Sequence, residues 1–206
     1  MHHHRATRVL NERLPPLTGV LLAGGAARRF GANKILALLP NGEPLGLRAA
    51  ARLATAVDEM VVVVRADDRP TGAAFEGAGY RVVPCADAAL GMAHSLACGV
   101  AASRDSAAWM VALADMPVIE PTTLMLLAAC WRREDSIIVP RCAGATGHPV
   151  IFPARFRAEL LALTGDRGAR PVLDAHIPEI YEYITDDRGV LRDIDTPADL
   201  SKLGDL

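Results

Sequence analysis

Short, continuous apolar runs recur along this chain, and they constrain its fold more than any other feature. Several of the runs lack polar alternation, which is typical of strands that are covered on both faces. A more alternating run follows near the C-terminus. The predicted strands are Gly19–Ala23, Met60–Val64, Tyr80–Val83, Trp109–Ala114, Ile137–Pro140, His148–Phe152 and Glu179–Thr185.

Helix-compatible segments separate these runs. Strands that alternate with helices predict a mostly parallel sheet in an α/β sandwich. Ligands of such open sheets bind beyond the carboxyl ends of the strands, so we expect the functional residues directly after the apolar runs. The predicted helices are Pro44–Ala56, Gly91–Ser103, Pro121–Arg133 and Ala154–Leu163, and the Gly/Ala-rich stretch Thr71–Gly79 is expected to be a helix and turn between elements rather than a domain boundary.

The sequence shows neither an internal repeat nor a linker, which predicts one domain over residues 18–206. Residues 1–17 contain three consecutive histidines, then polar residues and a Pro15-Pro16 pair. This composition is typical of a disordered leader or a tag remnant. We therefore leave these residues out of the site prediction.

Composition excludes several classes of protein. The 206-residue chain has a formal net charge of −2, which gives no general attraction to nucleic acid or to an anionic membrane. No segment reaches the roughly 18 uninterrupted apolar residues of a membrane helix, and the N-terminus lacks a secretory signal. We expect a cytoplasmic protein. Without a C-x-x-C pair, the cysteines are expected to be buried thiols. They are Cys85, Cys98, Cys130 and Cys142.

The first predicted strand ends in the glycine pair Gly24-Gly25, which is followed by Arg28, Arg29 and Lys34. Glycine lets backbone N–H groups approach a ligand closely, and arginine and lysine bind phosphate oxygens. The spacing matches neither G-x-x-x-x-G-K-[ST] nor G-x-G-x-x-G, which argues against a P-loop NTPase and a Rossmann dehydrogenase. Two interpretations stay open: a phosphate site, and an ordinary turn with a solvated basic face.

Carboxylates follow two further elements. Asp115 comes directly after the run that ends at Ala114, where it is well placed to bind Mg²⁺ or, alternatively, to cap a turn. Asp193 and Asp195 project on the same side of an extended segment, and Thr196 is the predicted cap of a final helix. We expect one of the two acids to face the metal and the other to cap the helix. Mg²⁺ needs only one or two protein carboxylates.

Together these motifs resemble the nucleotidyltransferases of the molybdenum cofactor, and specifically their cytidylyltransferase-like group. The resemblance runs from about Thr18 to Leu200 and rests on six segments in order. They are Leu22–Lys34, Gly91–Leu96, Leu113–Pro117, Gly147–Phe152, Gly165–Arg170 and Asp193–Pro197. It implies a three-layer, Rossmann-like α/β/α sandwich in which a nucleoside triphosphate and a phosphorylated acceptor meet over Mg²⁺.

The resemblance also implies a reaction and its residues. The terminal phosphate of molybdopterin attacks the α-phosphate of the nucleotide, and pyrophosphate leaves. The catalytic residues implied are Lys34, Arg28 and Asp115, and the metal ligands are Asp115, Asp193 and Asp195. The nucleotide-binding residues implied are Leu22, Ala23, Gly24, Gly25, Arg28, Arg29, Lys34, Asp87, Gly91 and Ser95.

Three residues are assigned to the acceptor by the same resemblance: His148, Arg167 and Arg170. The imidazole stands at the entrance of a predicted strand, where a core histidine is the alternative. The two arginines lie beside glycines and suit a second phosphate, and an ordinary loop with a helix cap is the alternative. A receiving molybdoenzyme, or its chaperone, is a further partner that the resemblance suggests.

One position departs from the cytidylyl pattern. That branch usually has alanine at the position of Gly24, whereas a double glycine followed by paired arginines is more typical of the guanylyltransferase branch. The segments Gly147–Pro149 and Gly165–Arg170 favour the cytidylyl branch, so CTP is predicted over GTP. The alternatives are transfer to another small phosphorylated acceptor and a non-catalytic protein that delivers the cofactor. The basic loop and the two separate acidic sites argue against the delivery protein.

Overall fold

The computed structural model describes residues 16–25, 30 and 33–203. In this part of the chain the strands form one sheet in the order β3-β2-β1-β4-β7-β5-β6, with β8 paired to β5. The strands are β1 Leu17–Leu22, β2 Glu59–Arg65, β3 Arg81–Cys85, β4 Ala108–Leu113, β5 Ile137–Cys142, β6 Ala145–Thr146, β7 Val150–Pro153 and β8 Ile180–Ile184.

The predicted strands are all present, with ends that differ by a few residues. β6 was not predicted, because a strand of two residues carries no periodic signal. Leu17 corrects the predicted leader boundary: it is fully buried as the first residue of β1, and the carbonyl of Pro16 accepts a hydrogen bond from the amide of Ala107. Residues 1–15 lie outside the described residues.

The sheet is mostly parallel, as predicted. β1 pairs in parallel with β2 and with β4, β2 pairs in parallel with β3, and β5 with β8. β7 is antiparallel to both β4 and β5. The chain passes from β5 through β6 to β7 without an intervening helix, and such short connections join antiparallel strands, whereas parallel strands need a longer crossover.

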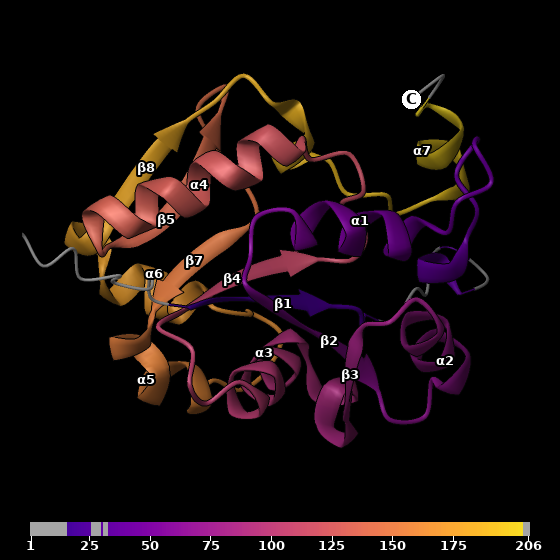
Figure 1. Cartoon of the computed structure of the whole chain (residues 1–206), viewed down its shortest axis with the longest axis horizontal. Helices are drawn as coiled ribbons and strands as arrows, with labels where there is room; N and C mark the ends of the chain where they lie inside the picture. Colours follow the sequence, from indigo (N-terminus) through magenta and orange to yellow (C-terminus); the bar gives the residue numbers. More distant parts are fainter. Residues whose placement is uncertain (1–15, 26–29, 31–32, 204–206) are drawn as a thin grey trace, which may run out of the picture.

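Helices cover both faces of the sheet. Figure 1 shows α1 and α4 on one side and α3 and α5 on the other. The predicted helices are confirmed, although the segment predicted over 154–163 divides into a 3-10 turn and α5. Within the described ranges, none of the helices combines the length and the apolar character that a bilayer crossing needs. The α-helices are α1 Leu45–Ala54, α2 Arg69–Gly77, α3 Met92–Ala102, α4 Pro121–Glu134, α5 Arg157–Leu161, α6 Arg170–Ala175 and α7 Pro197–Ser201.

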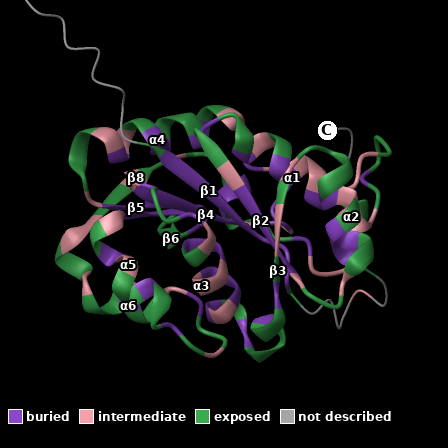
Figure 2. Cartoon of the chain, turned by 60° about the horizontal axis from the view of Figure 1, so that its bottom comes forward, coloured by how far each residue is buried: buried purple, intermediate pink, exposed green. Residues whose placement is uncertain are grey.

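The two faces of the sheet carry separate hydrophobic cores. Alternate residues of β1 point to opposite faces, so Leu21 joins the core under α1 and α4, whereas Val20 joins the core under α3. Buried residues fill the central strands β1, β4 and β7, and exposed residues lie on the outer faces of the helices and along the edge strands (Figure 2). The three-layer α/β/α sandwich is therefore confirmed.

A third, smaller cluster fastens the C-terminal segment to the rest of the domain. Leu39, Leu45, Ile194 and Leu203 are buried together. Helix α7 begins at Thr196 with a capping box, in which the Thr196 side chain accepts from the Asp199 amide and the Asp199 carboxylate accepts from the Thr196 amide. The predicted cap is thus confirmed. The expectation that Asp193 or Asp195 caps this helix is wrong, because the cap is shared by Thr196 and Asp199.

Two of the cysteines are not the free thiols that the sequence predicts. Cys85, the last residue of β3, and Cys98 on α3 form a disulfide with their Cα atoms 6.1 Å apart. The two residues meet because α3 packs on the face of the sheet to which the Cys85 side chain points. Cys130 and Cys142 are free thiols, and Cys142 is buried.

A charged cluster joins α5, α6 and the start of β8. The ring nitrogens of His176 lie 2.8 Å from Glu159 Oε2 and 2.9 Å from Glu179 Oε1. These hydrogen bonds, first the one to Glu159 and then the one to Glu179, raise the pKa of His176, and the bond from His176 lowers the pKa of Glu179. The imidazolium is therefore favoured by the fold.

This cluster predicts a stability that depends on pH. Because the folded pKa of His176 lies above its ordinary value of about 6.5, its stabilisation is fully present below that pH and is lost as the pH rises through the folded pKa. His176→Gln is expected to lower the free energy of unfolding, measured by urea denaturation, more at pH 5.5 than at pH 8.5. Glu159→Gln is the control, since it should reduce the pH dependence. A difference that is constant with pH would contradict this role.

Candidate functional site

The sheet has a switch point at β1. The chain continues from β1 to β2 on one side and reaches β4 on the other, and such a point opens a crevice at the carboxyl ends of the strands. Leu22 and Leu113 are partners in the register of β1 and β4, and the amide of Ala114 donates to the carbonyl of Leu22. Gly24 and Asp115, each two residues further on, therefore lie at the same edge.

Three pockets open at this edge, and Leu22 lines all of them. The glycine pocket, of about 310 Å³, contains Gly24 and Gly25. The carboxylate pocket, of about 220 Å³, contains Asp115 and Asp195. The arginine pocket has a volume of about 190 Å³ and is bounded in part by Arg167 and Arg170. The end of β1 is the shared wall, so ligands in these pockets would be neighbours.

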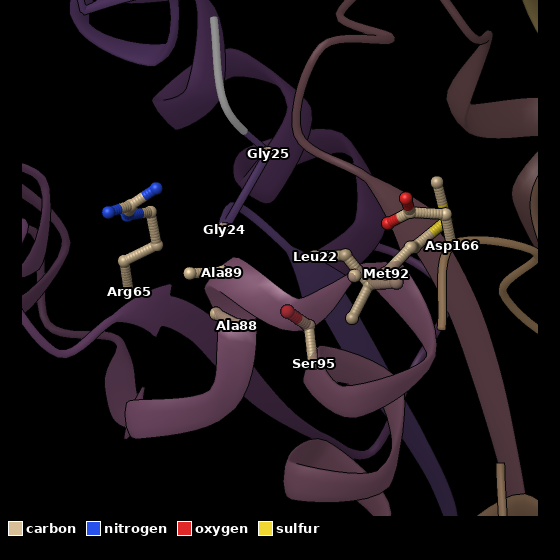
Figure 3. A pocket seen from close by; sticks show the side chains of 10 residues that line it. Leu22, Gly24, Gly25, Arg65, Ala88, Ala89, Met92, Ser95 and Asp166 are labelled. Atoms are coloured by element: carbon tan, nitrogen blue, oxygen red, sulfur yellow. The ribbon is translucent and has the colours of Figure 1, made fainter. Parts of the chain in front are cut away.

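The glycine pocket is formed by the segment after β1, the turn before α3 and the first turns of α3 (Figure 3). A Cβ atom at Gly24 would lie 3.0 Å from Ser95 Oγ and 3.3 Å from Ala88 Cβ, so a larger residue would have to move α3 slightly. The backbone of β1 and the buried Ser95 hydroxyl are thus brought close together. The lining residues are Leu22, Gly24, Gly25, Arg65, Ala88, Ala89, Gly91, Met92, Ser95 and Asp166.

Gly91 joins two segments that the sequence singles out separately. Its φ of +132° lies in the region that favours glycine, and an added Cβ would fall 2.3 Å from the carbonyl oxygen of Gly165. The same carbonyl accepts a hydrogen bond of 3.1 Å from the amide of Ala93. The start of α3 and the loop over 165–170 are therefore in direct backbone contact.

The carboxylate pocket contains a buried lysine between two acids. Lys34 Nζ lies 2.8 Å from Asp115 Oδ2 and 3.0 Å from Asp195 Oδ1. Burial by itself lowers the pKa of Lys34, but the hydrogen bonds and charges of Asp115 and Asp195 outweigh it, so the pKa of this lysine is raised. The ammonium is charged at neutral pH, and two of its three donors are used by the acids.

Local structure explains why these three side chains meet. Lys34 opens a short 3-10 turn and is itself buried, with Ile35 beneath it in the core. The amide of Ile194 donates to the carbonyl of Asp115, and the Ile194 side chain is buried in the third cluster. The C-terminal segment is thus tied to the residue that follows β4, which brings Asp195 to the pocket.

The carboxylate pocket fits a divalent cation. Among the described residues, Asp115 Oδ1 is buried and has no hydrogen-bond partner, which leaves an anionic oxygen free to ligate. Of the two predicted C-terminal ligands, Asp195 lines this pocket, whereas Asp193 is exposed and does not line it. No group of three or more acidic, histidine or cysteine ligands is found in the part of the chain that the structure describes. Asp115 and Asp195 meet the requirement of Mg²⁺ for one or two carboxylates.

The arginine pocket brings the three predicted acceptor residues together. His148, Arg167 and Arg170 all line it, above an apolar floor from β4, β7 and α3. Both arginines pair with Asp174, at 2.9 Å and 2.8 Å, and this shared carboxylate holds the two guanidinium groups side by side. Their side chains are more than half exposed, so a ligand can reach them.

His148 is neutral in this environment. Burial lowers its pKa, and the opposing effects of the Asp115 charge, the Val111 backbone and the Asp193 charge do not reverse the shift. Within the described residues its Nδ1 atom is buried without a hydrogen-bond partner. Gly147, which precedes it, is held against the carbonyl of Val190. The imidazole therefore contributes a polar but uncharged group to the pocket.

Other predicted site residues differ in their placement. Arg28 and Arg29 lie outside the described residues. Ala23 is buried and its amide donates to the carbonyl of Val63, and it lines none of the three pockets described above. Asp87 is exposed on the turn before α3 and does not line the glycine pocket either. Its role in nucleotide binding stays a prediction.

Sequence reasoning missed two charged residues of the glycine pocket, Arg65 and Asp166. Arg65 is the last residue of β2, and its guanidinium donates twice to Asp67, at 2.9 Å and 2.7 Å. The rule that ligands lie beyond strand ends would have found Arg65, because it follows the apolar run Met60–Val64 directly. No local sequence signal indicates that Asp166 lines a different pocket from Arg167 and Arg170.

Comparisons with known proteins agree with this geometry. Residues 19–180 match the MobA-like NTP transferase domain. The chain is 34% identical over 200 residues to the purine catabolism protein PucB of Bacillus subtilis, covering 91% of this chain and 95% of that protein. It is 33% identical over 201 residues to nicotine blue oxidoreductase of Paenarthrobacter nicotinovorans, covering 92% and 97%.

A shorter match carries higher identity. Over 117 residues the chain is 46% identical to molybdenum cofactor guanylyltransferase of Burkholderia vietnamiensis, covering 54% of each protein. Among solved structures, Rv0371c of Mycobacterium tuberculosis superposes with a TM-score of 0.78 at 25% identity, covering 93% of this chain and 98% of that one. Its complex with manganese gives a TM-score of 0.75 at 24% identity, covering 91% and 97%. The predicted preference for CTP finds no support in these names.

The carboxylate pocket predicts which acids bind a metal. Asp195→Asn is expected to weaken Mn²⁺ binding by roughly tenfold or more, since loss of an outer partner alone typically costs that much. Asp193→Asn, two residues away, should leave the affinity unchanged. Electron paramagnetic resonance of free Mn²⁺ measures both dissociation constants. Equal effects of the two substitutions would show that the acids are not distinguished as the geometry indicates.

Proposed function

The chain belongs to the MobA-like NTP transferase domain family and is a nucleotidyltransferase, and from this premise we propose that it transfers a nucleoside monophosphate to the terminal phosphate of molybdopterin. The observation that carries the proposal is the arrangement of the three pockets around Leu22. A nucleotide in the glycine pocket and a phosphorylated acceptor in the arginine pocket would meet beside the carboxylate pocket. The product would pass to a receiving molybdoenzyme or its chaperone.

We propose GTP as the nucleotide. The relatives whose names specify a nucleotide of the molybdenum cofactor are guanylyltransferases, and the double glycine at Gly24-Gly25 agrees with that branch. CTP is the second candidate, because the segments Gly147–Pro149 and Gly165–Arg170 resemble the cytidylyl branch, and His148, Arg167 and Arg170 of these segments line the arginine pocket. Since Gly24 packs against Ser95, the size of the residue at position 24 affects the space that is left for the base.

The transfer needs alignment more than it needs a base. A phosphate acceptor is already anionic near neutral pH, so one of its oxygens can form the new bond to the α-phosphorus directly. The bond from that phosphorus to the bridging oxygen of the β-phosphate breaks, and its electron pair leaves with pyrophosphate. Positioning and charge stabilisation supply most of the catalysis in such reactions.

Lys34 is the residue we assign to charge stabilisation. Among the described residues its ammonium donates to Asp115 and Asp195, and a third donor is left for a phosphate oxygen. The two acids fix the position of the ammonium before any nucleotide binds. A donor that is already held in place does not have to reorganise as charge develops, which is the most effective form of electrostatic catalysis.

Asp115 and Asp195 would hold Mg²⁺, which when bound neutralises charge on the phosphate oxygens. The unpartnered oxygen of Asp115 supports this assignment. Arg167 and Arg170 would bind the acceptor phosphate as paired guanidinium groups, for which a planar fork of donors is well suited. The neutral His148 would orient the acceptor beside them without adding charge.

The proposal predicts which substrates release pyrophosphate. With Mg²⁺ and molybdopterin, GTP is expected to give release that requires the acceptor, and CTP is the arm that tests the second candidate. A coupled phosphate assay with each of the four nucleoside triphosphates measures the rate, and reactions without molybdopterin are the control. Release that needs another phosphorylated acceptor would retain the chemistry and refute molybdopterin, whereas no release with any acceptor would refute the transfer.

The role of Lys34 predicts a separation of turnover from binding. Lys34→Gln is expected to lower kcat by roughly 100-fold or more, as loss of one preorganised donor does elsewhere, while the Kd of the nucleotide changes only a few-fold. Lys202→Gln removes an exposed lysine directly after α7 and is the charge-matched control. Steady-state kinetics and calorimetry give the two quantities. Equal losses of kcat and affinity would contradict the assignment.

A further inference from the structure

The residues of the loop over 165–170 line two different pockets. Asp166 lines the glycine pocket, whereas Arg167 and Arg170 line the arginine pocket. The sequence treats this segment as one acceptor motif. In the folded chain, however, its acidic residue is on the side where the base of a nucleotide would lie. A carboxylate in that place is not needed to bind an anionic acceptor, so it requires a separate explanation.

The position of Asp166 is fixed by its neighbours. The carbonyl of the preceding Gly165 accepts a hydrogen bond from Ala93, which anchors the loop on the first turn of α3. An added Cβ at Gly91 would lie 2.4 Å from Asp166 Oδ1, so the carboxylate packs directly against the Gly91 backbone. Figure 3 shows Arg65 on one side of the pocket and Asp166 on the other, with Gly24 and Ser95 between them.

Among the described residues, the carboxylate oxygens of Asp166 are unused as hydrogen-bond acceptors. Arg167, the next residue, pairs with Asp174 instead. In the described ranges Asp166 makes neither a hydrogen bond nor an ion pair. An ionised carboxylate can only accept, and its two oxygens can take up to about four hydrogen bonds. It therefore suits a ligand edge that presents N–H groups, and it repels an edge that presents carbonyl oxygens.

Nucleobases differ in this respect. Guanine presents its N1–H and its 2-amino group, and cytosine presents its 4-amino group. Xanthine and uracil carry a carbonyl oxygen in place of those amines. On the opposite wall, Arg65 uses Nε and one terminal nitrogen for Asp67, which leaves further N–H donors of its guanidinium for the acceptor atoms of a base. The two walls thus offer an acceptor and a donor.

We propose that Asp166 reads the nucleobase, accepting hydrogen bonds from the amine that distinguishes guanine from xanthine and cytosine from uracil. This inference rests on the proposed function, because it takes the glycine pocket as the site of the base. It holds for either candidate nucleotide, since both GTP and CTP carry the amine. It makes Asp166 a specificity residue rather than part of the acceptor site.

The test asks whether a substitution at Asp166 reverses the preference for an amine-bearing base over a carbonyl-bearing base. Asp166→Asn replaces one carboxylate oxygen by an amide that donates, so it should favour a carbonyl where the wild type favours an amine. The Kd values of GTP, XTP, CTP and UTP are measured by calorimetry with Mg²⁺ and without acceptor. The wild type should prefer the amine-bearing base of the relevant pair by roughly tenfold or more, and the variant should reverse that preference. Thr164→Ala, at an exposed position directly before this loop, is the control and should keep the wild-type order.

Other outcomes would overturn the inference. An equal loss of affinity for all four nucleotides would place Asp166 against the ribose or phosphates, or give it a role in holding the loop. Unchanged affinities would show that it does not contact the nucleotide. A thermal melt of the variant checks that the fold is retained. Because binding is measured without acceptor, failure of the swap is distinguishable from failure of pyrophosphate release, which tests the transfer itself.

Discussion

The contact on which the site depends is the hydrogen-bonded bridge from Lys34 to Asp115 and Asp195. It joins three segments that are far apart in the sequence: the loop after β1, the end of β4 and the approach to α7. Removal of a buried ammonium from water is costly, and a buried ion pair is a weak source of stability. We therefore propose that the bridge serves the site rather than stability, by keeping two acids and a cation in one arrangement before ligands bind.

The sheet topology places that bridge in one of three adjoining pockets. Because β1 lies at the switch point, its last residue, Leu22, is the common wall of the glycine, carboxylate and arginine pockets. Helices α1, α2 and α4 cover one face and α3 covers the other, and the crevice lies at the carboxyl edge of the strands. Reactants bound there cannot be far apart, which is the main requirement of phosphoryl transfer.

Much of this was predictable from sequence, and the limits are physical. Continuous apolar runs predict the buried strands, and the strand-end rule predicts Asp115 and Gly24. The same rule applies to Arg65, which was nevertheless missed. Contacts between distant segments have no local signal, so the sequence left Asp193 and Asp195 equivalent until the third cluster oriented the segment. The Cys85–Cys98 disulfide was not predicted for the same reason, since its two cysteines meet only through the packing of α3 on the sheet.

The loop over 165–170 connects the glycine pocket with the arginine pocket. Its backbone rests on Gly91 at the start of α3, where only glycine fits, and adjacent side chains of the loop face different pockets. A shift of this loop on nucleotide binding would therefore move Arg167 and its partner Asp174 as well. If the base binds in the glycine pocket and the acceptor in the arginine pocket, as we propose, this one short segment, anchored on α3 by the hydrogen bond from Ala93 to Gly165, gives the base a means to affect the acceptor site.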